Sequence, residues 1–300
     1  MRERAPSVPR EAVVNRGVVP SDPNLLQTDS VTIPVRLCNL PPFHSIANQV
    51  LALSADPDID LKRMAKVMEA DPAFAAEVLF LANSSLFGFT SQMHVLRHAV
   101  AILGLERIKA LAVTVAMRTF MAGGGSAVRA CWRHSAACAI VAEEISGAFG
   151  FEGERAYTVG LMHDIGRLGL LKSYPSELAP LLACEFQDSD EVLRAERAAV
   201  DVDHATAGGW LVNTWAFPRE FVEVCSRHHE PFCLSDSALL TITKVACKMA
   251  DALGYSAVQY TTAPNYQAVL HSMHPNLQRS FPDEAELRTK VDKRFAAFER

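Results

Sequence analysis

Histidines and aspartates recur after residue 130 in an order that suits metal binding. Five of the ten histidines and two aspartates form this series, namely His134, His163, Asp164, His204, His228, His229 and Asp251. Neutral imidazoles and carboxylates together are suitable ligands for first-row divalent metals such as iron, manganese or zinc. The series therefore predicts a site for one or two divalent metal ions. The alternative is a buried polar network that holds no ion.

The adjacent residues His163 and Asp164 stand in the apolar run "GLMHDIGRLGLL", residues 160–171. Ionisable groups in such a run cost free energy unless they are paired or bound to a metal. Neighbouring residues on a helix point about 100° apart, so the two side chains can approach a cation from two directions. An aspartate can also bridge two cations, because it has two oxygens. The pair His228-His229 offers two further nitrogens.

The segments that must position these groups have helical patterns. From residue 43 onwards apolar residues recur at helical spacing, and alternating runs of β-branched residues are scarce. Asp60 and Asp71 are expected to cap two early helices, with Pro72 at the first position of the second. Every member of the metal series falls in an expected helix, and the pattern predicts an all-α protein. The later helices are expected at 156–171, 176–187, 189–200, 203–215, 218–229 and 236–254.

Glycine and proline mark the boundaries between segments. Residues 1–35 carry five prolines and no sustained periodicity, which predicts a flexible N-terminal arm. The triple glycine at 123–125 separates an N-terminal helical subdomain, 37–122, from a second helical subdomain, 126–260, that carries the metal series. The tail, 262–300, ends in a charged helix that docks either on the body of the protein or on a partner.

Composition excludes several classes of protein. The net charge of -5 provides no general attraction for nucleic acid, so nucleic acid is not an expected partner. Seven cysteines without a C-x-x-C pair are typical of free thiols in a reducing cytosol. The N-terminus lacks the apolar core of a secretory signal, and no stretch reaches the ~18 apolar residues of a membrane span. We expect a cytoplasmic protein that does not interact with a membrane.

Two parts of the sequence resemble known bacterial proteins. The order H…HD…H…HH…D is similar to the metal-ligand pattern of the HD phosphohydrolase superfamily, in its two-metal HD-GYP-like form. The stretch "LPPFHSIANQVLALSADPDIDLKRMAKVMEADPAFAAEVLFLANSSLFGF", followed by "HAVAILGLERIKALAV", resembles the HDOD domain, a bacterial signalling module related to HD-GYP. The resemblance covers about residues 37–255. It implies an HDOD-type fold with an N-terminal helical subdomain and an HD-type helical bundle.

The resemblance also implies a role for each residue of the series. Asp164 would bridge the two metals and orient a hydroxide between them, which could attack a phosphorus atom. Arg167 would contact the phosphate or form a salt bridge with a nearby acid. One metal would be held by His134, His163, Asp164 and Asp251, and the other by Asp164, His204, His228 and His229.

Two departures from the HD-GYP pattern affect the expected function. HD-GYP enzymes usually have "HDIGK", whereas Arg167 replaces the lysine here, and arginine does not release a proton at accessible pH. The Gly-Tyr-Pro signature is also missing after "HHE". The first expectation is therefore a regulatory module that binds a signalling partner protein or a nucleotide second messenger. The alternative is a metal-dependent phosphohydrolase or phosphodiesterase that acts on a phosphate ester or nucleotide, with Asp164 and Arg167 as its catalytic residues.

Overall fold

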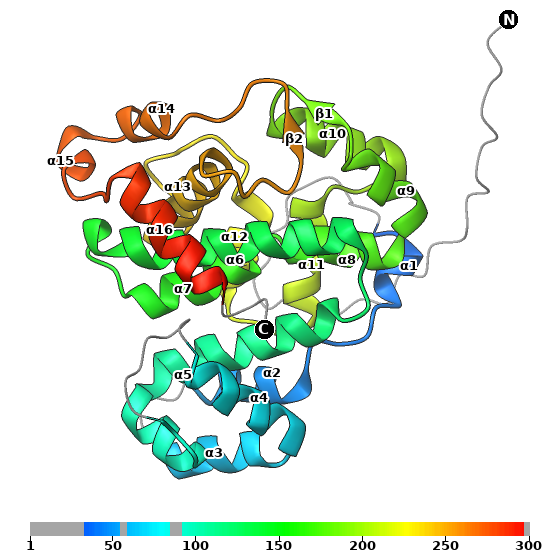
Figure 1. The fold of residues 1–300 in the computed structure, drawn as a ribbon. Coiled ribbons are helices and arrows are strands. Elements are labelled where there is room, and N and C mark those ends of the chain that lie inside the picture. Colours follow the sequence, from blue (N-terminus) through cyan, green and yellow to red (C-terminus); the bar gives the residue numbers. More distant parts are fainter. Residues whose placement is uncertain (1–32, 55–58, 85–91, 297–300) are drawn as a thin grey trace, which may run out of the picture.

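The computed structural model describes residues 33–54, 59–84 and 92–296, and the regular secondary structure of these residues is almost wholly helical (Figure 1). The predicted all-α fold is confirmed. Within the described ranges, the only strands are β1 (Glu185–Phe186) and β2 (Gln259–Tyr260), which pair in parallel. The helix expected at 176–187 is therefore too long, because its last residues form β1 instead. All but the end of the predicted N-terminal arm lies outside the described residues.

Three short helices pack against a longer one in the N-terminal part of the chain, coloured blue to cyan at the bottom of Figure 1. Asp60 and Asp71 cap two of them, as predicted. Oδ1 of Asp60 accepts the Lys62 backbone N–H at 2.8 Å, and Oδ1 of Asp71 accepts the Ala73 N–H at 3.0 Å. The short helices are α2 (Ser45–Leu53), α3 (Leu61–Glu69) and α4 (Pro72–Ala82), and the longer helix is α5 (Leu96–Met121).

The long helix α5 joins the two parts of the molecule. It bends at Gly104, whose φ of 77° lies in the left-handed region that glycine adopts at least cost. The backbone at Gly104 is not helical, so two helical segments meet there. Beyond the bend, every residue from Ala110 to Met117 is buried. This half of α5 packs against a helix of the C-terminal part of the chain, α7 (Gly153–Met162).

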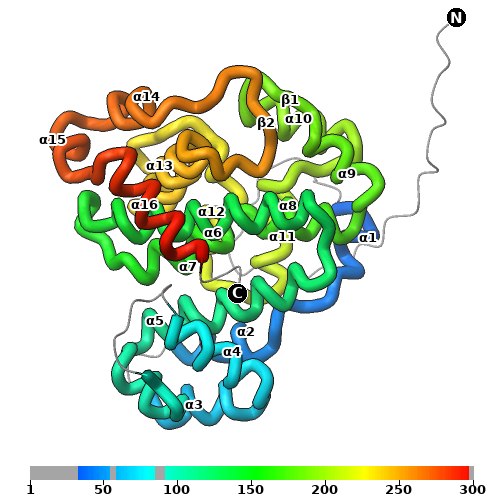
Figure 2. Tube along the Cα trace, in the orientation of Figure 1, coloured from blue at the N-terminus to red at the C-terminus, as the bar shows by residue number. Residues whose placement is uncertain are grey.

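The C-terminal part of the described chain surrounds α6 (Ser126–Ser146), whose central residues are buried on all sides. Helix α6 packs against α7 and α13, whereas α11 packs against α8 and α12 (Figure 2). The next helices after α7 are α8 (Ile165–Ser173), α9 (Pro175–Leu181), α10 (Ser189–Val200), α11 (His204–Thr214), α12 (Arg219–Arg227) and α13 (Ala238–Ala252). A 3-10 turn, η1 (Gly147–Phe149), follows α6, and the short N-terminal helix α1 (Val35–Cys38) packs on α8.

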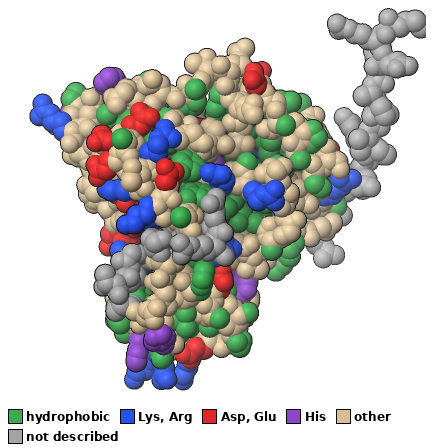
Figure 3. All heavy atoms as spheres, viewed as in Figure 1, with side chains coloured by type: hydrophobic (Ala, Val, Ile, Leu, Met, Phe, Trp, Pro, Cys, Tyr) green, Lys and Arg blue, Asp and Glu red, His purple; other side chains and the backbone are tan. Residues whose placement is uncertain are grey.

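The last helices fold back onto this body. They are α14 (Tyr266–His271), α15 (Pro275–Gln278) and α16 (Glu284–Phe295). Helix α16 lies on α6, where Lys290 forms an ion pair with Glu144 at 2.8 Å and Arg294 with Glu143 at 2.7 Å. Acidic and basic side chains are interspersed on this face (Figure 3). Of the two alternatives for the terminal helix, docking on the body is the one observed.

A glycine contact sets the distance between α8 and α11. A Cβ atom added at Gly166 would lie 2.0 Å from the His204 carbonyl oxygen and 2.3 Å from the Gly208 nitrogen. Both neighbours are backbone atoms, so a side chain would force the helices apart. We therefore infer that Gly166 is what allows the start of α11 to approach the start of α8.

Replacing Gly166 with alanine is expected to lower the free energy of unfolding by about 3 kcal/mol, because overpacking against backbone forces helices to shift. Denaturant unfolding followed by circular dichroism measures the change. Gly147→Ala is the matched control, because its added Cβ would meet open space and its φ of -59° suits alanine. Equal losses in the two variants would contradict the close-contact explanation.

No helix among the described residues is long and apolar enough to cross a membrane.

Candidate metal centre

The adjacent pair His163-Asp164 lies in a break between two helices. Helix α7 ends at Met162 and α8 begins at Ile165, so the single helix expected over 156–171 is wrong at this point. The Asp164 backbone, at φ -106° and ψ 21°, leaves the helical region. This break turns both side chains inward, where each is only 1% exposed.

Helix ends also position three of the other histidines. His204 is the first residue of α11, after the cap Asp203, whose Oδ1 accepts the Thr206 N–H at 2.7 Å. His228 is the C-cap of α12, and His229 follows it directly. Side chains at the ends of separate helices can converge on one point, because no helix backbone stands between them. The members of the series inside helices are His134 in α6 and Asp251 in α13.

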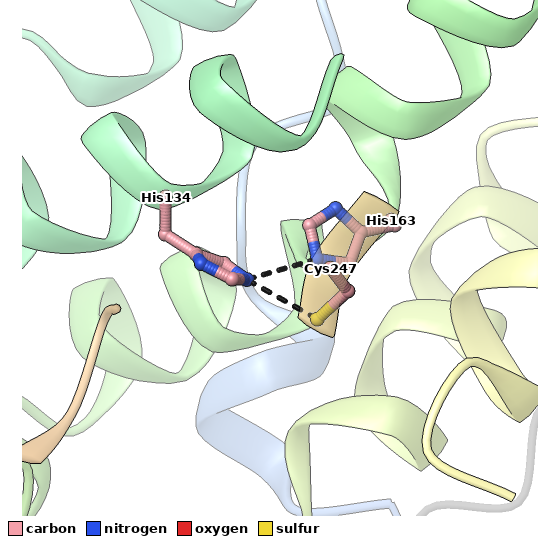
Figure 4. Close-up of side chains that lie close together, drawn as sticks. All are labelled: His134, His163 and Cys247. Carbon is pink, nitrogen blue, oxygen red and sulfur yellow. Dashed lines mark hydrogen bonds between the residues drawn. The ribbon is translucent and has the colours of Figure 1, made fainter. Parts of the chain in front are cut away.

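One group of ligand atoms comprises His134, His163 and Cys247, from α6, the α7–α8 break and α13 (Figure 4). Nε2 of His134 lies 3.3 Å from Nε2 of His163 and 3.5 Å from the Cys247 sulfur. Nδ1 of His134 is 3.0 Å from the Tyr255 carbonyl oxygen, and Nδ1 of His163 is 2.7 Å from that of Gly160. Because a carbonyl only accepts, Nδ1 carries the proton in each neutral ring. Both Nε2 lone pairs therefore point into the same small space.

A second group comprises His204, His228 and His229, whose ligand nitrogens lie within 4.8 Å of one another. Nδ1 of His228 is 3.2 Å and 3.1 Å from two carbonyl oxygens of α12. Its Nε2 is buried and has no hydrogen-bond partner among the described residues. Nδ1 of His204 is 2.6 Å from Oε2 of Glu196. Hydrogen bonds of this kind orient histidines for metal binding and leave the other nitrogen free.

Between the two groups lies a buried ion-pair network. Asp164 and Arg167 form an ion pair at 3.0 Å, and Asp164 Oδ1 is 3.4 Å from His204 Nε2. Nη2 of Arg167 lies 3.0 Å and 3.2 Å from the two ring nitrogens of His204. Its Nε is 3.4 Å from Glu196 Oε1. Arg167 therefore forms salt bridges with nearby acids, one of the two alternatives that its sequence context left open.

Sequence reasoning missed Glu196, a carboxylate with no exposed surface on α10. Besides its contact with Arg167, it accepts the His204 backbone N–H at 2.9 Å. Its spacing carried a signal that the prediction did not use. Val192 and Val200, four residues before and after it, are buried on the same face of α10. A glutamate at a core position of an amphipathic helix requires a buried cationic or hydrogen-bonding partner.

Cys247 was also missed, although it precedes Asp251 by one turn on the same face of α13. Asp251 lies behind the His134 ring, with its Oδ1 3.3 Å from Nδ1, while Cys247 lies at Nε2. The Asp251 carboxylate also accepts the Ser256 hydroxyl at 2.7 Å. Burial raises the pKa of Asp251, although the attraction of His134 opposes the shift. In this arrangement Asp251 lies beside Nδ1 of His134, whose hydrogen-bond acceptor is the Tyr255 carbonyl oxygen.

His163, His228 and His229 are neutral at ordinary pH. Burial lowers the pKa of His163 to about 3, although the charge of Asp164 opposes the shift. Burial, reinforced by the neighbouring imidazoles, also places the pKa values of His228 and His229 well below the usual range. Burial alone would raise the pKa of Asp164, but the charges of Arg167 and the histidines outweigh it and lower the pKa. The centre thus combines an ionised carboxylate with neutral imidazoles, the forms that bind metals.

Comparison with known proteins places this geometry in a family context. The family model for the HDOD domain matches residues 40–231 of the chain. The chain spans 44% of the length of a curated relative, an uncharacterized protein of Treponema pallidum, to which it is 22% identical over 227 residues. That alignment covers 74% of this chain.

Solved structures with the same fold carry both signalling and enzymatic names. An HDOD domain protein with unknown function from Geobacter sulfurreducens has a TM-score of 0.69 and 23% identity, covering 87% of this chain and 93% of that one. A provisionally named signal transduction protein from Marinobacter aquaeolei VT8 has a TM-score of 0.64 and 20% identity, covering 86% of this chain and 58% of that one. A provisionally named phosphohydrolase from Shewanella amazonensis SB2B has a TM-score of 0.62 and 21% identity, covering 87% of this chain and 94% of that one. At these identities the likeness shows the fold.

Proposed function

Since the chain belongs to the HDOD domain family, we propose that it is a bacterial signal-transduction module with a divalent metal bound at its buried histidine centre. Its output is the binding of a partner protein or of a nucleotide second messenger. The observation that carries this proposal is the convergence of two groups of three ligand atoms, each group within 4.8 Å. The signalling name of a structural neighbour supports the same class of function.

The chemistry of the donors fits a divalent ion. His163 and His228 each commit Nδ1 to backbone carbonyls, so each offers Nε2 to an ion. The buried Nε2 of His228 without a partner is the kind of group that a bound ion satisfies. An ion here would polarise a phosphate oxygen and acidify a bound water. Asp164 supplies negative charge between the two groups of histidines.

The state of Arg167 favours a regulatory module over an enzyme. Its guanidinium is 4% exposed and contacts Asp164, His204 and Glu196. Attraction to Asp164 and Glu196 outweighs the effect of burial and raises its pKa. To bind a substrate phosphate, the Arg167 guanidinium would have to break its buried contacts with Asp164, His204 and Glu196. It also cannot replace the proton-transferring lysine of "HDIGK".

The second candidate function is a metal-dependent phosphohydrolase or phosphodiesterase, with Asp164 and Arg167 as catalytic residues. The five inward-facing histidines favour it, because together they retain the imidazole ligands expected of a two-metal site. The provisional phosphohydrolase name of a neighbour agrees with it. Hydrolysis of a bis-aryl phosphate or a nucleotide panel with added manganese, abolished in Asp164→Ala, would establish this candidate. No turnover is expected from the regulatory module.

Protein purified anaerobically is expected to contain at least one equivalent of divalent metal, measured by inductively coupled plasma mass spectrometry. His163→Ala is expected to lose most of this metal, because His163 Nε2 points into the ligand space. His98→Ala is the matched control, since His98 is exposed on α5 and should leave the metal content unchanged. Less than one equivalent in the wild-type protein, with none gained on metal addition, would overturn the proposed metal centre.

A further inference from the structure

We propose that the centre holds a single metal ion, bound by the nitrogens of His134 and His163 and by the sulfur of Cys247, with Arg167 taking the place of a second cation. This inference rests on the proposed metal binding and specifies its ligands and stoichiometry. It departs from the ligand set that the sequence series predicts, because it adds a thiolate and removes one metal. A ligand set of two imidazoles and one thiolate favours zinc.

Two distances within the first group match those of a tetrahedral zinc site. Zinc lies ~2.0–2.1 Å from histidine nitrogen and ~2.3 Å from cysteine sulfur. Tetrahedral angles then place two nitrogens about 3.3 Å apart, and a nitrogen and a sulfur about 3.6 Å apart. The corresponding distances are 3.3 Å between His134 Nε2 and His163 Nε2, and 3.5 Å between His134 Nε2 and Cys247 Sγ. Figure 4 shows the three side chains converging.

The surroundings of the three ligands support the same assignment. Asp251, which the series predicts as a ligand, instead contacts Nδ1 of His134, the usual position of a supporting carboxylate. Cys247, one turn earlier on α13, reaches Nε2 in its place. Burial raises the pKa of the Cys247 thiol. Metal binding therefore forms a metal–sulfur bond and releases the thiol proton to solvent.

Arg167 occupies the space where a second ion would meet its ligands. Its Nη1 is 3.0 Å from Asp164 Oδ2, and its Nη2 is 3.0 Å from His204 Nε2. An ion bound to both Asp164 and His204 would have to displace this positive charge. The nitrogens of His204, His228 and His229 nevertheless remain within 4.8 Å of one another. Removing the guanidinium should therefore open a second site.

The first test uses cobalt(II) as a spectroscopic replacement in the full-length protein. The wild-type protein is expected to bind one equivalent of cobalt, with a sulfur-to-cobalt charge-transfer band in the near ultraviolet. Cys247→Ser should lose this band, whereas Cys225→Ser should keep it. Cys225 is the matched control, since it is equally buried and its thiol donates to the Met162 carbonyl oxygen at 3.3 Å. If the wild-type protein binds cobalt without the charge-transfer band, Cys247 is not a thiolate ligand. This result does not depend on whether the variants fold.

The second test is the number of metals per chain. The wild-type protein should saturate at one equivalent of zinc, and Arg167→Met, which removes the charge but keeps a long side chain, should saturate at two. Two equivalents in the wild-type protein would overturn the single-metal assignment while leaving metal binding intact. No binding of either metal would instead overturn the proposed function. Circular dichroism checks that each variant is folded. The metal stoichiometry of the wild-type protein tests the single-metal assignment even if a variant does not fold.

Discussion

Acidifying the metal-free protein from pH 7 to pH 5 is expected to lower its free energy of unfolding by several kcal/mol. In the unfolded chain His163, His228 and His229 bind protons below about pH 6.5. In the folded protein His163 binds a proton only near pH 3, and the pKa values of the other two are also well below the usual range. The unfolded state therefore binds more protons, and stability falls as pH drops below 6.5. Each histidine contributes about 1.4 kcal/mol per pH unit.

The carboxylates of the centre modify this acid dependence. Asp251 opposes it, because its raised pKa means that the folded state binds a proton at higher pH than the unfolded state does. Asp164 and Glu196 have lowered pKa values, so their stabilisation is present above their unfolded pKa and is lost as pH falls further. The net slope between pH 6.5 and pH 5 should therefore remain strongly destabilising towards acid.

Urea unfolding at several pH values, with a chelator present, measures this slope. His228→Asn should reduce it by about 1.4 kcal/mol per pH unit, because one buried neutral imidazole is removed. His98→Asn should leave the slope unchanged, since His98 is exposed. An identical slope in both variants would show that the buried histidines do not govern acid stability.

Replacing Glu196 with alanine is expected to cost about 3–5 kcal/mol of stability, the usual effect of removing one partner from a buried ion pair. Glu196 receives the His204 backbone N–H and ring Nδ1 and faces Nε of Arg167 at 3.4 Å. Its loss leaves a buried guanidinium with only Asp164 to balance its charge, and leaves the His204 backbone N–H without its acceptor. Thermal or denaturant unfolding provides the measurement.

Two further variants test whether the loss of stability comes from the ion-pair network or from a general effect on α10. Asp190→Asn removes an exposed charge near the start of the same helix and should change stability by less than about 1 kcal/mol. The double variant Glu196→Ala with Arg167→Met should recover part of the loss, because the buried charge is removed together with its partner. Strictly additive losses in the double variant would refute the coupling between Glu196 and Arg167.

The candidate metal centre and its ion-pair network depend on the same helix contacts. His204 reaches Asp164 and Arg167 because α11 approaches α8 closely at Gly166. Glu196 in turn anchors the first residue of α11. A change in either contact should therefore move His204 relative to His163.

The sequence by itself determined the helical period and the caps of two early helices. The periodicity from residue 43 onwards predicted helices, and Asp60 and Asp71 predicted two helix starts, because such signals depend only on near neighbours along the chain. The order of histidines and aspartates also identified the residues around the centre. The break at His163-Asp164 was missed, because the apolar run "GLMHDIGRLGLL" has no proline and because Asp164, the N-cap of α8, was interpreted only as a metal ligand.

Only the tertiary structure decided which atoms meet. Cys247 and Asp251 share a face of α13 one turn apart, so their spacing could not say which one would reach Nε2 of His134. The spacing likewise left Arg167 free to face a phosphate or an acid, until the packing of α10 placed Glu196 beside it. Ligand geometry is decided by tenths of an ångström, whereas helical periodicity defines a face to within a turn of about 5.4 Å. Contacts between helices, such as that at Gly166, supply the missing precision.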